Sequence, residues 1–312
     1  MSLERALELA ERGRGTTYPN PVVGAVVVRD GEVVGEGWHE RKGGPHAEVV
    51  ALEAAGEQAR GATLFLTMEP CSHHGATPPC TAAVLEAEVA RVVAGSLDPN
   101  PDAAGGLELL RERGVEVELV DSFAARAQND AWRVWVAERR PFVILKLAVT
   151  LDGRVAIPGR RWITGEEARH RVHELRGQVD AVAVGLGTVR ADAPMLTARD
   201  VGAMRQPRRL AFGRGPLPAD SELELRGGPL EHELRALGAE GVQSLLLEGG
   251  PTLAASFLLA GVVDKLLLFV APVLAGAGPA FVPDLPDPIS LARLRAESVG
   301  DDVLLSGYVH EP

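Results

Sequence analysis

The sequence is poor in cysteine and contains no long apolar run, and each absence excludes a class of protein. Two cysteines in 312 residues are too few for the disulfide framework of a small secreted domain. We therefore expect free thiols, available as metal ligands, in a reducing cytoplasmic setting. No run of about 18 apolar residues occurs, so a membrane partner is not expected. The first residues do not have the pattern of a secretory signal.

Positive charge and aromatic side chains are also scarce. Lys and Arg total 32 against 43 Asp and Glu, a formal net charge of −11. A protein that binds a polyanion by counterion release normally has the opposite excess. Aromatic residues make up 4% of the chain and offer few platforms for base stacking. A nucleic-acid editing enzyme is therefore disfavoured, and we expect a small-molecule substrate.

The length and the pattern of the chain predict two α/β domains. A chain of 312 residues is typical of two domains. Short apolar runs alternate with amphipathic segments along the first 120 residues, which is the pattern of an α/β layer fold. An Ala- and Arg-rich amphipathic stretch from Ser122 to Arg140 ends at Pro141, which disfavours further helix. We place the domains at residues 1–140 and 141–312.

The first domain shows clear strand and helix signals. Apolar, β-branched runs predict strands at Val22–Val28, Val33–Gly37, Ala62–Thr67, Val89–Gly95 and Val115–Val120. Amphipathic segments predict helices at His46–Arg60, Cys80–Ala87 and Gly106–Arg113, with a glycine after the first and the last as a stop signal.

The second domain opens with a hairpin signal. The run Phe142–Leu151, the turn pair Asp152 and Gly153, and Arg154–Ile157 predict a strand, a tight turn and a return strand. Thr164 and Glu167 have capping-box spacing before a helix at Ala168–Arg176, which Gly177 should end. The Gly- and Pro-rich stretch Gly213–Gly228 predicts a loop. Further strands are predicted at Val179–Val184, Arg209–Phe212, Val242–Leu247, Lys265–Val270 and Val303–Tyr308.

Three residues of the first domain form a candidate zinc site. His46 opens a predicted helix, Cys71 follows a predicted strand, and Cys80 begins the next helix. One imidazole and two thiolates suit tetrahedral zinc, and three protein ligands leave the fourth position free for water, as in catalytic sites. Glu48 lies two residues after His46, where a carboxylate can move protons without binding the metal.

Other interpretations of these residues remain open. A lone Cys or His is more often an ordinary buried residue than a ligand, but the combination matches the zinc deaminase signature. Eight residues separate the cysteines, where most of that superfamily has two. His73 and His74 lie in this interval as competing ligands. A non-enzymatic zinc-stapled module is a further alternative, which would supply a fourth protein ligand.

The first domain resembles the deaminase half of the bifunctional deaminase-reductase family of riboflavin biosynthesis. The resembling segments include Pro19–Gly24, Pro45–Glu48, Glu69–Gly75, Thr77–Cys80 and Asp98–Pro101. The resemblance implies a cytidine-deaminase-like α/β/α fold and a long insert between the cysteines. It also implies zinc ligands at His46, Cys71 and Cys80, an acid/base at Glu48, and nucleotide contacts at Asn20 and His39.

The second domain resembles the reductase half of the same family, which has a dihydrofolate-reductase-like α/β fold. Resembling segments include Lys146–Ala148, Trp162–Gly165, His173–Arg176, Val184–Val189 and Glu248–Leu253. The resemblance implies substrate contacts at Arg176, Leu196, Arg199 and Glu248. It implies NADPH contacts at Ala148, Trp162, Thr188, Asp192, Gly250, Pro251, Thr252, Leu253, Ala254, Ala255 and Ser256. A helix start after paired glycines also suits a diphosphate on physical grounds.

The chain departs from the family pattern at two positions that bear on binding. Ala76 stands where the family usually has Arg or Lys within the cysteine insert. The segment from Gly159 to Trp162 is one residue short, and Arg160 replaces the substrate-binding serine.

The resemblance implies two consecutive reactions on one nucleotide. A zinc-dependent deamination of 2,5-diamino-6-ribosylamino-4(3H)-pyrimidinone 5′-phosphate would precede NADPH-dependent reduction of its ribosyl group to ribityl. A homo-oligomer is expected. The alternative is a zinc deaminase of a free base or nucleoside whose second domain is not catalytic.

Overall fold

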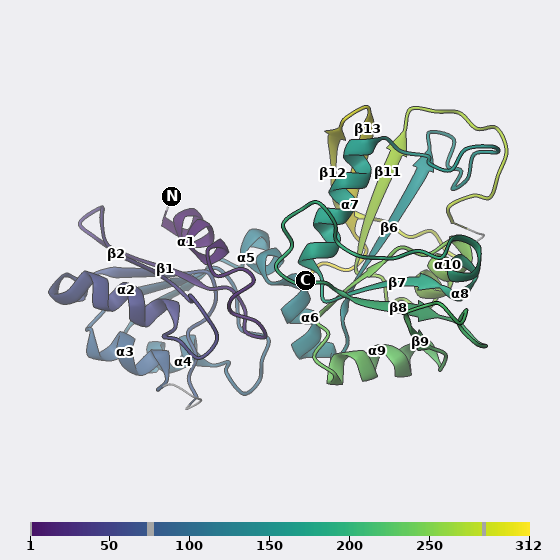
Figure 1. The fold of residues 1–312 in the computed structure, drawn as a ribbon. Helices are drawn as coiled ribbons and strands as arrows, with labels where there is room; N and C mark the ends of the chain where they lie inside the picture. The colour runs from purple at the N-terminus through teal and green to yellow at the C-terminus, as the bar shows by residue number, and fades with distance from the viewer. Residues whose placement is uncertain (1, 74–77, 283–284) are drawn as a thin grey trace. The chain divides into compact units, whose positions relative to one another are not determined.

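The computed structural model describes residues 2–73, 78–282 and 285–312 and divides the chain into two compact units (Figure 1). Unit 1 is Met1–Ala137 with Pro312, and unit 2 is Glu138–Glu311. The division falls at the end of helix α6 (Asp130–Glu138), close to Pro141.

Unit 1 is built on a five-stranded sheet of order β2-β1-β3-β4-β5. β1 is antiparallel to β2 and β3, whereas β3, β4 and β5 are parallel. The strands are β1 (Gly24–Arg29), β2 (Glu32–Trp38), β3 (Thr63–Leu66), β4 (Arg91–Ala94) and β5 (Glu116–Leu119). The helices are α1 (Ser2–Glu11), α2 (Ala47–Ala55), α3 (Cys80–Glu86), α4 (Gly106–Glu112), α5 (Phe123–Gln128) and α6.

The predicted elements of unit 1 are present, with two differences. Helix α1 was not predicted, although its buried Ala6, Leu9 and Ala10 follow a helical spacing. The helix predicted to reach Arg60 ends at Ala55 and continues as a 3₁₀ turn, Gly56–Ala59. Gly56 has φ of 52° and ψ of −134°, a backbone conformation that glycine adopts far more readily than other residues and that ends the α-helix.

Two glycines let helix α2 lie directly on the sheet. A Cβ added to Gly35 would lie 2.3 Å from the carbonyl oxygen of Ala51, and one added to Gly37 would lie 2.5 Å from that of Ala47. Any side chain at these positions would push the helix away from β2. This close approach places the N-terminus of α2, where His46 lies, at a defined height above the sheet.

Unit 2 is built on an eight-stranded sheet of order β12-β13-β11-β6-β10-β7-β8-β9. The strands from β11 to β9 are parallel, and β13 and β12 add antiparallel pairs at one edge. The strands are β6 (Phe142–Thr150), β7 (Ala181–Gly185), β8 (Arg208–Phe212), β9 (Glu224–Arg226), β10 (Ser244–Leu247), β11 (Lys265–Ala271), β12 (Ala292–Val299) and β13 (Asp302–Tyr308). The helices are α7 (Glu166–Gln178), α8 (Leu186–Asp192), α9 (Leu230–Ala239) and α10 (Pro251–Leu259).

The predicted return strand Arg154–Ile157 is wrong. The residues after the turn bond the segment after β11 instead of β6, because the N–H of Val155 donates to Pro279 O and that of Phe281 donates to Gly153 O, both at 3.1 Å. Asp152 accepts hydrogen bonds from the backbone N–H groups of Ala275 and Gly276 at 2.9 and 2.8 Å. The turn after β6 is therefore tied to the segment after β11, and Arg154 forms an isolated bridge with Ala280.

The predicted ends of the next helix are also wrong. Gly165 caps α7, and its N–H donates to Asp302 Oδ2 at 2.7 Å in place of a capping-box bond. The helix continues through Gly177 to Gln178. A Cβ on Gly177 would lie 3.1 Å from the Ala203 Cβ, so this glycine allows close packing and does not end the helix.

Four further elements of unit 2 differ from the expectation or were not predicted. The stretch expected as a loop at Gly213–Gly228 contains the short edge strand β9. Helices α8 and α9 and the largely exposed strand β12 were not predicted. Among the described residues, every helix is too short or too polar to span a membrane.

Candidate functional site

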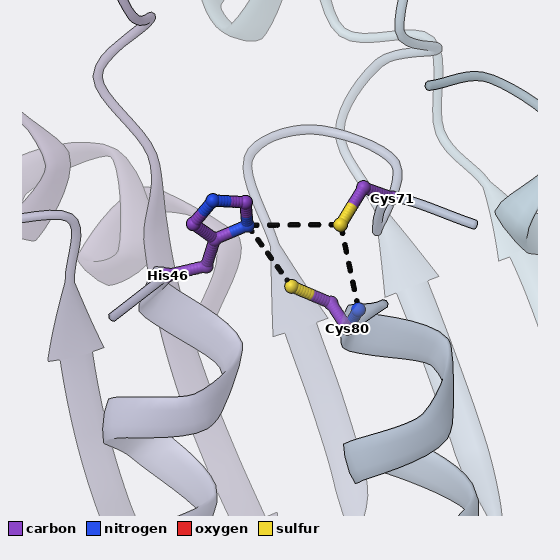
Figure 2. Close-up of side chains that lie close together, drawn as sticks. All are labelled: His46, Cys71 and Cys80. Atoms are coloured by element: carbon purple, nitrogen blue, oxygen red, sulfur yellow. Dashed lines mark hydrogen bonds between the residues drawn. The ribbon is translucent and has the colours of Figure 1, made fainter. Parts of the chain in front are cut away.

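The fold of unit 1 brings His46, Cys71 and Cys80 together (Figure 2). Their ligand atoms all lie within 4.8 Å of one another. His46 Nδ1 is 3.1 Å from Cys80 Sγ and 3.7 Å from Cys71 Sγ. Ligand atoms around a tetrahedral zinc are roughly 3.5 Å apart, given its bond lengths. The cluster therefore fits zinc and contributes three of four positions. Within the described residues His73 is exposed and outside the cluster, and His74 lies outside the described residues.

Two of the three candidate ligands stand at the starts of helices, and the third lies in the loop that follows a strand. His46 immediately precedes α2, Cys80 is the first residue of α3, and Cys71 lies in the segment after β3. The Cys80 N–H donates to Cys71 Sγ at 3.4 Å. Hydrogen bonding from Cys80 lowers the pKa of the Cys71 thiol to about 4 and raises that of Cys80. The metal-free pair therefore shares one proton, which a metal displaces on binding both sulfurs.

Glu48 lies in the first turn of α2 and is only 3% exposed. Burial raises the pKa of this carboxyl group to about 7. A group with a pKa near neutrality can both accept and release a proton at neutral pH. The position predicted for an acid/base therefore holds a carboxyl group suited to that chemistry.

His39 and Asn20, the predicted nucleotide contacts, lie beside the metal cluster. The ring centroids of His39 and His46 are 5.4 Å apart. His39 Nδ1 lies 3.0 Å from the carbonyl oxygen of Pro45 and must donate to it, which leaves Nε2 to accept from Asn20 Nδ2 at 3.3 Å. Burial lowers the pKa of His39. A neutral imidazole and an amide therefore stand together next to the cluster.

Glu69, which sequence reasoning did not single out, anchors a loop next to the cysteines. Its carboxylate is 6% exposed. Oε1 accepts from the backbone N–H groups of Gly105 and Leu107, both at 3.1 Å, and Oε2 accepts from that of Asp98 at 3.2 Å. Its position directly before Pro70 and Cys71 was visible in the sequence. Nothing in the sequence indicated its three backbone partners.

The anchored loop packs on the two cysteines of the cluster. Ala103 belongs to the same buried cluster as both cysteines. Ser72 donates to the loop through its N–H to Ala103 O at 3.2 Å and through its hydroxyl to Ala104 O at 2.8 Å. A Cβ on Gly106 would lie 1.8 Å from Pro70 O, so the start of α4 contacts this backbone directly. The loop and the start of α4 thus enclose one side of the cluster.

Unit 2 contains a cavity of about 670 Å³. Six of the predicted substrate or cofactor residues line it: Trp162, Arg176, Asp192, Leu196, Arg199 and Glu248. Ala148, Thr188 and the residues from Gly250 to Ser256 do not. A Cβ on Gly250 would lie 4.0 Å from Thr188 Oγ1, so these two predicted cofactor positions are neighbours. Lining residues absent from the predicted set include Lys146, Arg161, Arg169 and His173.

Glu248 is held between two cations in this cavity. Arg176 donates through Nε and Nη2 to the two carboxylate oxygens at 2.6 and 3.0 Å. Lys146 Nζ lies 3.7 Å from Oε2. Burial alone would raise the pKa of Glu248, but the charges of Lys146 and Arg176 outweigh it and hold the pKa below its ordinary value. Lys146 was recognisable as one of three lysines, set in an apolar strand.

Two family models match the chain. The model described as "RibD C-terminal domain" matches residues 141–305. The model described as "Cytidine and deoxycytidylate deaminase zinc-binding region" matches residues 2–96. The matches correspond to unit 2 and to most of unit 1, and they confirm the predicted deaminase-like and dihydrofolate-reductase-like fold classes.

Relatives resemble the chain over almost its whole length. The riboflavin biosynthesis protein RibD of Aquifex aeolicus is 38% identical over 97% of this chain and 96% of its own. That of Escherichia coli is 40% identical over 97% of each chain. The structure of Acinetobacter baumannii RibD is similar with a TM-score of 0.84 at 35% identity, covering 98% of this chain and 97% of that one.

A second solved structure is named for two activities. It is a diaminohydroxyphosphoribosylaminopyrimidine deaminase/5-amino-6-(5-phosphoribosylamino)uracil reductase from Thermotoga maritima. Its TM-score is 0.83 at 35% identity, and the similarity covers 98% of this chain and 97% of that one. The predicted family is thus confirmed by full-length relatives as well as by both domain models. The chain belongs to the RibD family of bifunctional deaminase/reductase enzymes of riboflavin biosynthesis.

Proposed function

We propose that unit 1 deaminates 2,5-diamino-6-ribosylamino-4(3H)-pyrimidinone 5′-phosphate and that unit 2 reduces the ribosyl group of the product with NADPH. The observation that carries the deaminase is the three-donor cluster with the buried Glu48 in the helix that His46 caps. The two activities for which the Thermotoga maritima relative is named support the same two steps.

The residues of unit 1 have the chemistry for hydrolytic deamination. His46, Cys71 and Cys80 would hold the zinc ion, which as a Lewis acid makes water a nucleophile near neutral pH. Glu48 takes the proton of the attacking water and delivers it to the amino group that leaves as ammonia. The ring carbon gains a C–O bond and loses its C–N bond, so atoms and charge balance. Asn20 and His39 orient the pyrimidine beside Glu48.

The residues of unit 2 suit a phosphorylated sugar and a dinucleotide. NADPH supplies the hydride for the anomeric carbon of the opened ribose. Arg176, Arg199, Leu196 and Glu248 bind the sugar phosphate, and guanidinium groups match phosphate geometry. The N-terminal turn of α10, within Gly250 to Ser256, binds the diphosphate through free backbone N–H groups. The remaining proposed NADPH contacts are Ala148, Trp162, Thr188 and Asp192.

Two wider proposals accompany this function. Two free, buried thiols support a reducing cytoplasmic location. The homo-oligomer expected from the sequence stays a prediction, which sedimentation of the purified protein tests.

A coupled assay tests the proposed function. Zinc-replete protein is mixed with the diaminopyrimidinone ribosyl phosphate and NADPH, and ammonia release and NADPH absorbance are followed together. We expect ammonia to appear first and NADPH to be consumed afterwards. Ammonia without NADPH consumption would contradict the reductase and favour a deaminase with a non-catalytic second unit. Absence of both signals would contradict both assignments.

A further inference from the structure

The cationic residues around the cavity of unit 2 fall into two groups. Arg176 and Lys146 are paired with Glu248. Arg161, Arg169 and Arg199 line the same cavity. In the described part of the chain, none of these three guanidinium groups forms an ion pair with a carboxylate. In the first group one carboxylate offsets part of the positive charge, whereas the three arginines of the second group have no carboxylate ion-pair partner among the described residues.

Two of these arginines are held against one aromatic ring. The guanidinium carbons of Arg161 and Arg169 lie 4.9 and 5.2 Å from the centroid of the Trp162 ring. Trp162 is 56% exposed, so this stack stands at the solvent side of the cavity. Arg169 is fixed further, because its Nη1 donates to Thr164 O at 2.7 Å. Stacking restricts the guanidinium groups while leaving their N–H donors available.

Two like charges close to the same ring repel each other, and an anion placed between them removes that repulsion. A phosphate matches the planar donor fork of arginine, with two parallel hydrogen bonds to one guanidinium. Arg169 comes from α7 and Arg161 from the loop before it. The stack is thus a preorganised receptor for a phosphate group.

We propose that Arg161, held on Trp162 beside Arg169, binds a phosphate group of a ligand in this cavity. The inference rests on the proposed reductase function and adds a binding residue to it. The cavity has two possible sources of such a phosphate, the ribosyl phosphate of the substrate and the 2′-phosphate of NADPH. The family resemblance places Arg160 at the position of the missing serine, but Arg161 is the residue that lines the cavity.

Arg160 supplies a matched control. It is exposed, lies next to Arg161 in the same loop, and does not line the cavity. R160Q and R161Q therefore remove the same charge from the same loop. R161K retains the charge but loses the planar fork, so it separates bidentate binding from simple attraction.

Steady-state kinetics with the holoenzyme distinguish the two sources. We expect R161Q to raise the KM for one phosphorylated ligand by about tenfold with little change in kcat, R161K to be intermediate, and R160Q to match the wild type. A higher KM for NADPH, with that for NADH unchanged, would identify the 2′-phosphate. A higher KM for the substrate, with both dinucleotides unchanged, would identify the ribosyl phosphate. Equal behaviour of R161Q and R160Q would overturn the inference.

A binding measurement keeps this test separate from the proposed function. Isothermal titration of NADPH and of inorganic phosphate requires no turnover. If the wild type binds either one and R161Q binds it several-fold more weakly than R160Q does, the stack is a phosphate site even in an enzyme that does not consume NADPH. If all three proteins bind both ligands equally, or bind neither, Arg161 is not a phosphate-binding residue.

Discussion

The two candidate sites of this chain differ in how far each is complete before any ligand arrives. In unit 1 two donors lie at the starts of helices and the third in the loop after β3, and the cysteines are buried and hydrogen-bonded to each other. In unit 2 the cavity is lined by residues from β6, α7, α8 and the loops, and several of its arginines have no carboxylate partner among the described residues. The first site has its three donor atoms already assembled. The second needs anionic ligands to balance its charge.

The difference follows from the chemistry of each site. A metal site requires three donor atoms within a few ångströms, and rigid element ends provide that spacing. A site for large phosphorylated ligands requires space, and its charges remain solvated until the ligand displaces water. The following changes test whether the two sites are independent, from the largest expected effect to the smallest.

The largest effect is expected from C80S. Replacing one of three ligands, here a buried thiol, removes the donor set that zinc requires, so ammonia release should become undetectable. Metal content after gel filtration and the ammonia assay measure this. NADPH consumption with the already deaminated substrate should be unchanged. Loss of both activities would show that the sites are not independent.

Glu48→Gln should affect chemistry without affecting the metal. The amide is nearly the same size but cannot exchange a proton, so ammonia release should fall by roughly 10²- to 10⁴-fold while zinc content stays at the wild-type level. Zinc analysis and the ammonia assay on the same sample check both parts. Wild-type turnover in this variant would remove Glu48 from the mechanism.

Glu248→Gln tests the paired zone of the second site. It leaves Lys146 and Arg176 buried without a counter-charge, and loss of one partner of a buried pair costs about 3–5 kcal/mol. Because the pKa of Glu248 is lowered in the folded state, the carboxylate contributes stability above its ordinary pKa, and this is lost as the pH falls through the lowered value. Urea unfolding at several pH values measures it.

The control for this experiment is Glu231→Gln, because Glu231 is exposed on α9. It should unfold like the wild type at every pH. A pH-independent difference between Glu248→Gln and the wild type would contradict the assigned ion pair.

The smallest effect is expected from Glu69→Gln. The amide oxygen can still accept from Gly105 and Leu107, but its NH₂ group would face the N–H of Asp98. Loss of one hydrogen bond to a charged group costs about 1.5–3 kcal/mol. We expect that loss of stability in urea and faster release of zinc to a chelator. The exposed Glu53→Gln serves as control, and equal zinc release by both variants would show that the loop does not support the metal ligands.

The metal motif could be predicted because its information is local. His46 and Cys80 stand at helix starts that periodicity and proline already mark, Cys71 follows Pro70 in the loop after a predicted strand, and their donor chemistry admits few metals. Glu69 and Lys146 were missed for the opposite reason. A charged residue in an apolar segment indicates that a partner exists, but it does not identify the partner. Glu69 is bonded by the backbone of the loop before α4, and Lys146 is paired with Glu248. Both partners lie far along the chain.

The errors in secondary structure have the same origin. The turn after β6 has an acceptable hairpin sequence, yet the residues that follow it bond the distant segment from Pro279 to Phe281. Thr164 has capping-box spacing, yet Asp302 from β13 bonds the N–H at the start of α7. Gly177 has the sequence of a helix end, yet it serves packing against Ala203. Local signals fail where a remote partner competes for the same group.

Composition, periodicity and motif spacing were thus sufficient for the α/β class, the presence of two domains and the grouping of His46 with the two cysteines, because each depends on residues close in sequence or on averages over the chain. Tertiary structure alone decided which charges are paired in the second cavity, that Arg161 and not Arg160 lines it, and which loop supports the cysteines. These depend on contacts between distant segments, whose geometry is set by the packing of the whole unit.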